Sequence, residues 1–187
     1  MEKATWNPTT LIAPVPPVLV GVGDENKKNV FTVAWTGIIN SKPPKTYISV
    51  RPERYSYEFI KKTGEFTINL ASCDIVKAVD FCGVRSGKAL DKFEKTGLTA
   101  IKGEKINAPI IEQCPINLEC KVFDSMDLGS HTMFLADIVN VRVDEKLVDK
   151  NGRLMIEKAN LLSYAHGTYF SLGKSLLTFG RSVRKKK

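Results

Sequence analysis

Short apolar stretches separated by turn residues dominate the pattern of hydrophobic and polar positions along the chain. The stretch "VLVGVG" at residues 18–23 ends in the polar turn "GDENKKN" at residues 23–29, and "VFTVAWTGII" then extends from residue 30 to residue 39. Two apolar stretches around a polar turn predict a β-hairpin. β-branched and aromatic residues predict further strands in "TYISV", "FTINL", "INLECKVF" and "TMFLADIVNVRVD", and a hairpin-like segment in "KLVDKNGRLMI". Six or seven strands at this spacing favour an antiparallel barrel, so we predict a mainly β fold with helices.

Three stretches have a helical pattern. Two of them, "SCDIVKAVDFCG" at residues 72–83 and "KALDKFEKTG" at residues 88–97, each end at a glycine, as helices commonly do. The third lies in "ISVRPERYSYEFIKKTGEFTIN" at residues 48–69, where we expect Ser56 to be the N-cap and Gly64 to end the helix. Tyr55 and Ile60 occupy the two positions of a hydrophobic staple.

The start of this third helix carries two arginines, Arg51 and Arg54, next to Ser56. A helix start presents unpaired backbone N–H groups and the positive end of the helix dipole. Together with the arginines and the serine hydroxyl, these groups could hold a phosphate dianion. A capping serine beside two solvated arginines is an equally good interpretation of this stretch alone.

Composition is that of a compact intracellular protein. With 187 residues, 43% apolar and 26% charged, the chain can bury a core as one domain, residues 1–187. No apolar run reaches the roughly 18 to 20 residues that span a bilayer, and "MEKATWNPTTL" lacks the order of a signal peptide, so we expect a cytoplasmic protein. Four cysteines without a Cys-x-x-Cys pair and two histidines give no zinc-ligand spacing, so we expect free thiols and no metal.

Positive charge exceeds negative charge, with 28 Lys and Arg against 20 Asp and Glu. This excess favours an acidic partner: nucleic acid, an anionic membrane surface or a phosphorylated small molecule. The basic tail "RSVRKKK" at residues 181–187 contributes part of it, and such an end is more often solvated than a binding arm. Neither an RRM-type aromatic signature nor a KH-type loop is present, so nucleic acid is an unlikely partner.

An ordered series of segments carries a resemblance to a known family. The succession "NVFTVAWTG", "PP", "ISVRPERYSYEFIKKTGEFTINL", "DFCGVRSGKALDKF", "GLT", "AP" and "LGSHTMFLADIVNV" resembles the flavin reductase-like family, particularly its flavoredoxin branch, from about residue 11 to residue 169. The resemblance implies an FMN-binding split β-barrel of Greek-key type, usually a homodimer with the flavin near the subunit interface. The family includes NAD(P)H-dependent flavin reductases, ferric reductases and flavoprotein electron carriers.

The resemblance also implies which residues bind the cofactor. The strand matching "NVFTVAWTG" is expected beside the isoalloxazine ring, and the segment matching "SVRPERYS" beside the phosphate, held mainly by Arg51 and Ser56. The segment "DFCGVRSGK" adds glycines for close backbone approach, a serine hydroxyl, and Lys88 at the start of the next helix. Trp35 could equally be a core residue, and Cys82 a small buried one. The residues expected to contact FMN are Asn29, Thr32, Ala34, Trp35, Thr36, Ser49, Val50, Arg51, Arg54, Ser56, Cys82, Gly83, Ser86, Gly87 and Lys88.

His131, in "LGSHTMF", matches a family histidine near the flavin. The resemblance implies a contact with nicotinamide or substrate, although a structural hydrogen bond fits as well. His166 lies in "YAHGTYFSLG", which resembles the closing segment of the family, and we interpret Tyr164 and Tyr169 there as packing residues.

The function implied is hydride or electron transfer, with FMN carrying the chemistry. The chain has no Ser-His-Asp order and no paired carboxylates for hydrolysis. It also lacks a Gly-x-Gly-x-x-Gly turn, so NADH or NADPH would dock transiently over the flavin. Three functions remain: an FMN-dependent reductase passing electrons to free flavin, ferric iron or another acceptor; a non-enzymatic FMN electron carrier that meets a redox partner protein; and a basic barrel that binds nucleic acid.

Overall fold

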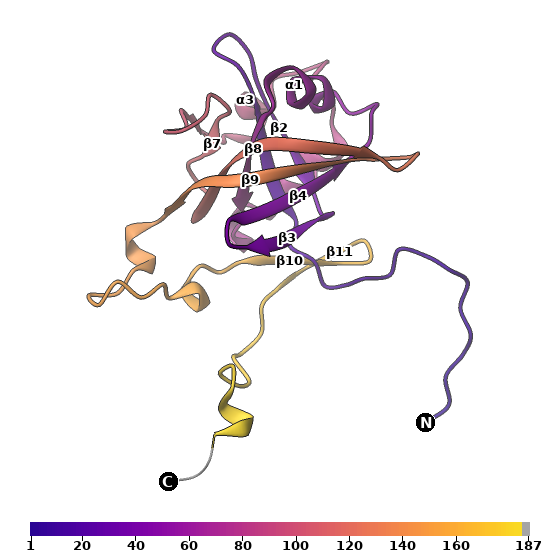
Figure 1. Cartoon of the computed structure of the whole chain (residues 1–187), viewed down its shortest axis with the longest axis vertical. Helices are drawn as coiled ribbons and strands as arrows, with labels where there is room; N and C mark the ends of the chain where they lie inside the picture. The colour runs from indigo at the N-terminus through magenta and orange to yellow at the C-terminus, as the bar shows by residue number, and fades with distance from the viewer. Residues whose placement is uncertain (185–187) are drawn as a thin grey trace.

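One large antiparallel sheet forms the body of the molecule in the computed structural model, which describes residues 1–184 (Figure 1). Its strands are β1 (Val18–Gly23), β2 (Lys28–Val33), β3 (Thr36–Ser41), β4 (Pro44–Val50), β5 (Glu65–Leu70), β8 (Ile116–Asp127) and β9 (Thr132–Val143). They are ordered β2-β1-β5-β8-β9-β4-β3, so β2 and β3 form the two ends and the sheet does not close. This confirms the mainly β antiparallel fold that the residue pattern predicts and the split barrel that the resemblance implies.

The core explains why β1 is apolar along its whole length. Val18, Val20 and Val22 pack into the barrel interior, together with Phe31 of β2 and Ile48 of β4. Since β2 and β4 lie near opposite ends of the strand order, this shared cluster shows that the sheet curls on itself. The opposite face of β1 lies against a second apolar cluster beneath the helices. All six residues of β1 are therefore buried.

The remaining elements cover the ends and the rim of the barrel. The helices are α1 (Ser56–Thr63), α2 (Val76–Val84) and α3 (Lys92–Thr96), with single 3₁₀ turns at η1 (Cys73–Ile75), η2 (Glu145–Leu147), η3 (Ile156–Lys158) and η4 (Arg181–Val183). Two small hairpins are formed by β6 (Ala100–Ile101) with β7 (Ile110–Ile111) and by β10 (Leu162–Ala165) with β11 (Thr168–Ser171). The β10–β11 hairpin is tied to the chain before β1 by a bridge between Val15 and Tyr164.

Two strand predictions were wrong in detail. The apolar stretch 30–39 is not one strand: β2 ends at Val33, and after Ala34 and Trp35 the chain continues as β3 at the other end of the sheet. The segment 146–156 is not a regular hairpin, because a single bridge between Val148 and Leu154 lies between two 3₁₀ turns. The break after β2 places Ala34 and Trp35 at the opening of the barrel.

The helix ends differ partly from those expected. Ser56 is the first residue of α1 rather than its cap, and no side chain caps this helix, although the helix does end at Gly64. Helix α2 continues through Gly83 and ends before the extended residue Arg85. Helix α3 begins four residues after Lys88 and is capped by Asp91, whose carboxylate accepts bonds from two backbone N–H groups. Lys88 therefore does not lie at a helix start.

The sequence also raises the questions of a membrane-spanning helix, paired cysteines and a metal site. No helix in residues 1–184 is both long and apolar enough to span a membrane. The four cysteines are unpaired. No cluster of three or more His, Cys, Asp or Glu side chains that could hold a metal ion occurs among the same residues.

Candidate functional site

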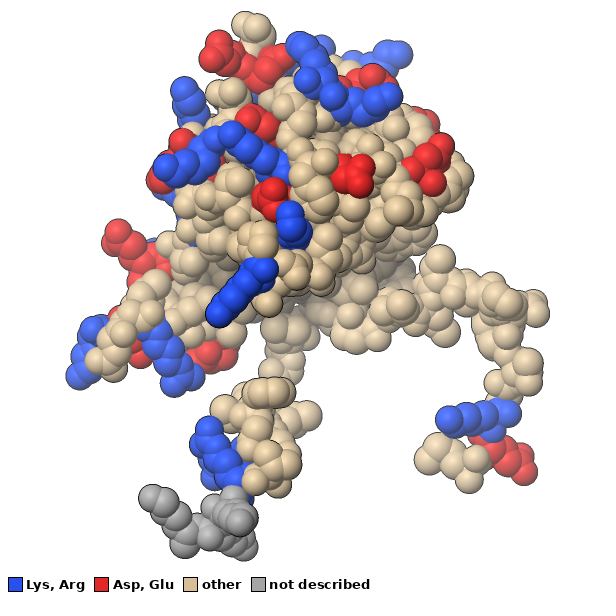
Figure 2. Space-filling model, viewed as in Figure 1, with Lys and Arg blue, Asp and Glu red and all other residues tan. Residues whose placement is uncertain are grey.

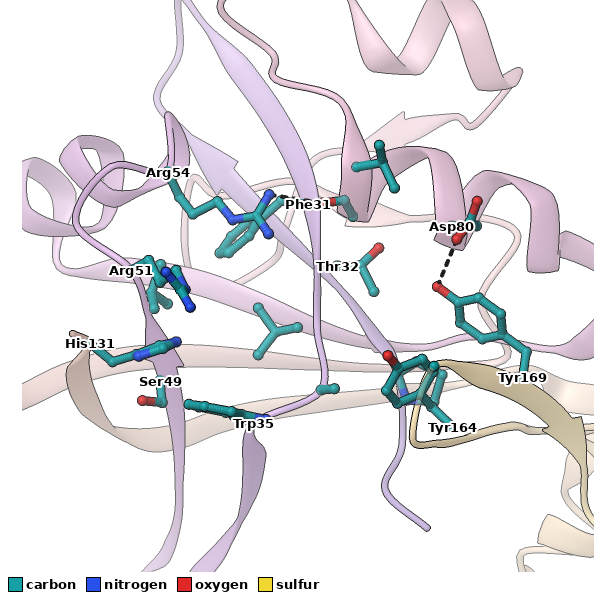
Figure 3. Close-up of a pocket in the computed structure, with 17 residues that line it drawn as sticks. Phe31, Thr32, Trp35, Ser49, Arg51, Arg54, Asp80, His131, Tyr164 and Tyr169 are labelled. Carbon is teal, nitrogen blue, oxygen red and sulfur yellow. Dashed lines mark hydrogen bonds between the residues drawn. The ribbon is translucent and has the colours of Figure 1, made fainter. Parts of the chain in front are cut away.

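Two adjoining cavities lie at the opening of the barrel. The first, of about 370 Å³, is bounded by the junction of β2 and β3, the end of β4, helix α2 and the β10–β11 hairpin (Figure 3). The second, of about 480 Å³, lies over the start of α1 and between α2 and α3. We call them the aromatic cavity and the basic cavity. Phe31, Arg51, Arg54 and Val84 line both, so the two form one elongated site.

An aromatic pair forms one wall of the aromatic cavity. The rings of Trp35 and His131 lie 4.4 Å apart between centroids, inclined at 31° (Figure 3). The Trp35 side chain is 44% exposed, so it is a surface that a ligand can contact and not a core residue. Partial burial, followed by the charge of Arg51, lowers the pKa of His131 below its usual value. The imidazole is therefore neutral at neutral pH, and its Nδ1 lies 2.9 Å from the Ser130 hydroxyl.

Two tyrosines from the β10–β11 hairpin line the same cavity. Tyr164 and Tyr169 lie 5.2 Å apart between ring centroids, and the Tyr169 hydroxyl donates to Asp80 Oδ1 of α2 at 3.3 Å (Figure 3). Burial, and then the charge of Asp80, raises the pKa of Tyr169 to about 12, so it stays a neutral phenol. The sequence predicts mainly packing roles for both tyrosines; Tyr169 does pack against the apolar cluster beneath α2, and both tyrosines also line the cavity.

Lys92, at the base of the basic cavity, is a buried cation. Only 3% of the residue is exposed, and its Nζ donates to the backbone carbonyl of Cys82 at 2.8 Å. No carboxylate in residues 1–184 forms an ion pair with it. Burial lowers the pKa of Lys92 to about 8, and the nearby charge of Arg54 acts in the same direction. A buried charge without a counter-ion is costly, so an anion in the basic cavity would offset that cost.

Other donors converge on the basic cavity. Arg54 Nη1 donates to the Gly83 carbonyl at 2.8 Å (Figure 3), while the exposed Arg51 makes only a long contact of 3.4 Å with Glu53. Asn29 and Ser56 are buried, and Asn29 Nδ2 donates to Ser56 Oγ at 2.8 Å. This bond leaves the Ser56 hydroxyl proton available for an acceptor in the cavity. Such a set of cations and a hydroxyl matches the needs of a phosphate.

The structure brings most of the residues selected from the sequence to these two cavities. Those on the aromatic cavity are Thr32, Ala34, Trp35, Ser49, Val50, Arg51, Arg54, Gly83 and His131. The basic cavity is lined by Asn29, Arg51, Arg54, Ser56, Ser86 and Gly87.

Three selected residues line neither cavity. The Thr36 hydroxyl donates to the Tyr47 carbonyl within the β3–β4 pair. Cys82 lies in α2 and is fully buried in the apolar cluster on the inner face of that helix. Burial raises the pKa of its thiol to about 11, so a reactive thiolate is disfavoured. Lys88 lies further out, beside Lys27, on the surface next to the basic cavity.

Sequence reasoning missed two charged residues of the site, Lys92 and Asp80. The segment "KALDKFEKTG" holds three lysines, and their spacing alone does not distinguish the second from the others. A signal does exist for Lys92, because it follows Asp91, a residue type that commonly caps helices, and so falls in the first turn of α3. Asp80 has no such signal, since a charged residue on a helix usually faces solvent.

Comparison with known proteins agrees with the fold and the site. The chain belongs to the family described as flavin reductase like domain, which matches residues 12–173. The structure of flavoredoxin of Desulfovibrio vulgaris (Miyazaki F) is similar to it, with 32% identity, a TM-score of 0.91 and coverage of 98% of this chain and 100% of that one. Flavoredoxin from Methanosarcina acetivorans has 28% identity, a TM-score of 0.87 and the same coverage. A ferric-chelate reductase (NAD(P)H) of Archaeoglobus fulgidus is 23% identical over 138 residues, 73% of each chain.

These similarities confirm the family and the flavoredoxin branch that the sequence resembles. The expected flavin cofactor is supported by the same family match and by the geometry. An elongated site with aromatic walls at one end and buried positive charge at the other fits a flavin ring with a phosphate on its side chain.

Gly87 provides a test of how the basic cavity is built. A Cβ atom at this position would lie 2.2 Å from Asn29 Oδ1, so the Gly87→Ala variant must displace the Asn29 side chain and its bond to Ser56. We expect FMN to bind roughly tenfold more weakly, the value of about one lost hydrogen bond. Titration by quenching of flavin fluorescence measures this. Gly173→Ala is the control, because no atom lies within 4 Å of the added Cβ; equal affinities in the two variants would contradict this role of Gly87.

Proposed function

We propose that this chain is an FMN-dependent reductase that passes electrons from NADH or NADPH through FMN to free flavin, ferric iron or a partner protein. The observation that carries the proposal is the buried Lys92 ammonium group, without a carboxylate partner in residues 1–184, at the base of a cavity continuous with an aromatic one. Membership of the flavin reductase-like family supports reductase activity in general.

The residues of the basic cavity would hold the phosphate of FMN. Lys92 supplies a desolvated positive charge, Arg51 and Arg54 supply guanidinium donors, and Ser56 supplies a hydroxyl. The residues of the aromatic cavity would hold the ring system, with Trp35 and His131 on one wall and Tyr164 on another. When bound, FMN supplies the hydride and one-electron transfer chemistry that no side chain of this site can perform.

We assign to His131 the contact with the nicotinamide that donates the electrons. The His131 ring is neutral at neutral pH, so it does not repel the positive charge that the nicotinamide ring acquires when it gives up a hydride. Its Nδ1 faces the Ser130 hydroxyl, which leaves Nε2 for a hydrogen bond to a donor or acceptor molecule that enters the aromatic cavity. A transient docking of this kind is consistent with a chain that has no Gly-x-Gly-x-x-Gly turn.

A non-enzymatic FMN electron carrier is the second candidate. It is favoured by the extent of the similarity to two flavoredoxins, which covers 98% of the chain. Under either function we propose the cytoplasm as the compartment, because four unpaired cysteines suit a reducing environment. No feature of the described chain favours nucleic acid over a flavin.

Anaerobic mixing of the FMN-loaded protein with NADH and with NADPH tests the reductase proposal. We expect one of the two to bleach the absorbance of oxidised flavin within seconds. The His131→Ala variant should bleach more slowly or need more nucleotide while retaining its FMN, because this residue is assigned to the donor. His166→Asn, at the exposed hairpin turn where φ is 47°, is the control. Bleaching by dithionite but by neither nucleotide would favour the carrier instead.

The role of Lys92 predicts a difference between FMN and riboflavin, which lacks the phosphate. Replacing Lys92 by Met should weaken FMN binding by roughly ten- to a hundredfold, the value of a charge-assisted hydrogen bond of about 1.5 to 3 kcal/mol, and leave riboflavin binding nearly unchanged. Arg51→Ala should act in the same direction but less, since its side chain is 55% exposed. Lys95→Met, an exposed neighbour on α3, is the control. Equal losses for both ligands would contradict a phosphate contact.

Lys92 also leads us to expect that the affinity for FMN depends on pH. Its pKa near 8 means that the ammonium form prevails below pH 8 and the neutral amine above it. Only the ammonium form attracts a phosphate dianion, so FMN affinity should fall as the pH rises above about 8. Calorimetric titration at a series of pH values should show this fall in the native protein. It should be absent in Lys92→Met, and a fall that persists in that variant would assign the titration to another group.

A further inference from the structure

A third cavity continues the site beyond the basic cavity. It has a volume of about 810 Å³ and lies between the β1–β2 turn, the segment that joins α2 to α3, and residues 98–100. Asn29, Gly87 and Lys92 line both this cavity and the basic cavity, so the two adjoin. We call it the lysine cavity after the four lysines that line it, which are Lys27, Lys28, Lys88 and Lys92.

The lysines that lie beyond the basic cavity have no acidic partner. No ion pair in residues 1–184 includes Lys27, Lys28 or Lys88. Asp91 is the single acid that lines the cavity, and its carboxylate already accepts bonds from two backbone N–H groups of α3 at 2.8 and 3.2 Å. The lysine cavity therefore has an excess of positive charge that an anionic ligand would balance.

The β1–β2 turn holds Lys27 at the rim of this cavity. The Asp24 carboxylate orders the turn, because it accepts bonds from two of its backbone N–H groups at 3.0 Å and from Lys62 Nζ at 2.9 Å. Lys27 Nζ lies 5.4 Å from the centre of the Tyr55 ring. Lys27 and Lys88 also line a surface hollow beside that ring, so the two lysines lie on the same rim.

An apolar wall distinguishes the lysine cavity from a site for a bare anion. Phe93 is half-buried and Leu98 is buried, and both line the cavity together with Ala89 and Leu90. A wall of this kind suits the flat face of a heteroaromatic base. The cavity therefore fits a ligand that carries both a base and a phosphate, such as an adenosine phosphate.

FMN itself does not account for the lysine cavity. Under the proposed function its ring lies in the aromatic cavity and its single phosphate lies in the basic cavity, among Lys92, Arg54 and Ser56. The FMN molecule ends at that phosphate. The lysine cavity beyond it is left to a second ligand.

We infer that the lysine cavity binds the adenosine end of the nucleotide donor, and that Lys27 and Lys88 recognise the 2′-phosphate that NADPH carries and NADH lacks. This inference rests on the proposed function, in which the nicotinamide contacts His131 in the aromatic cavity. The donor then lies along FMN, with its adenosine beyond the FMN phosphate. Cationic side chains accommodate the 2′-phosphate in other sites that take NADP, so the lysine cavity favours NADPH over NADH.

The outer surface near this cavity does not share its uniform charge. On the face that Figure 2 shows, Lys and Arg are interspersed with Asp and Glu over the end of the molecule where α1 lies. A nucleic acid binds through a continuous positive surface that neutralises successive phosphates. A single nucleotide needs positive charge only inside the cavity that it enters, so the distribution of charge favours a nucleotide.

Anaerobic reduction of the FMN-loaded protein over a range of NADPH and NADH concentrations tests the inference. The native protein should be half-saturated at a lower concentration of NADPH than of NADH. The double variant Lys27→Met/Lys88→Met should reduce this preference by roughly tenfold, because two exposed charge contacts, each contributing a few-fold, are lost. The control Lys77→Met/Lys95→Met removes two exposed lysines of α2 and α3 that do not line the cavity, and it should keep the preference. A native protein without a preference for NADPH, or a double variant that keeps it, would overturn the inference.

Binding of adenosine 2′,5′-bisphosphate, which has no nicotinamide, separates this inference from the proposed function. Calorimetric titration of the FMN-loaded native protein should show tighter binding of this probe than of adenosine 5′-monophosphate, and Lys27→Met/Lys88→Met should remove the difference. If the probe binds in this way but neither NADPH nor NADH bleaches the flavin, only the proposed function is contradicted. A native protein that does not bind the probe overturns the inference. It is also overturned if the FMN-free protein binds FAD more tightly than FMN by a margin that the double variant loses, because the cavity would then hold the adenylate of the flavin.

Discussion

The constraint on which the site depends is the end of helix α2, where two cations hold the last backbone carbonyls. Lys92 Nζ donates to the Cys82 carbonyl and Arg54 Nη1 to the Gly83 carbonyl, both at 2.8 Å. The C-terminal end of a helix leaves carbonyls unpaired and carries partial negative charge, so positive side chains are favoured there. These two bonds join the segment before α1, the end of α2 and the start of α3 around one cavity. They use only part of the donor capacity of each cation, and the remainder is available to an anion.

The barrel supplies the other half of the site through a break in its strand order. Because the chain crosses from β2 at one end of the sheet to β3 at the other, Ala34 and Trp35 lie at the opening and not inside a continuous strand. The backbone N–H of Ser49 in β4 donates to the Trp35 carbonyl at 2.9 Å and fixes this crossing, and the His131 ring, from the turn before β9, packs against the indole at an inclination of 31°. A flat aromatic wall thus lies next to a buried positive charge, an arrangement that suits a flavin phosphate better than a nucleic acid or a protein surface.

Local sequence patterns were sufficient for most of the fold and for much of the site. β-branched alternation identified β5, β8 and β9, and glycines marked the ends of α1 and α3. The break after Val33 could not be predicted, because the residues on both sides are apolar and the change of sheet end depends on tertiary contacts. Lys92 and Asp80 were missed for a similar reason: their sequence neighbours indicate a solvated helix surface, and only packing shows that one is buried and the other lines a cavity. Cys82, chosen by resemblance, contributes its carbonyl and not its thiol.

We propose that the phosphate of a bound flavin compensates the buried charge of Lys92. A crystal structure of the native protein loaded with FMN tests it most directly. We expect a phosphate oxygen within hydrogen-bond distance of Lys92 Nζ, with Arg54 and Ser56 as further ligands and the ring system beside Trp35 and His131. A flavin whose phosphate points to solvent, while Lys92 Nζ keeps the Cys82 carbonyl as its only partner, would contradict it.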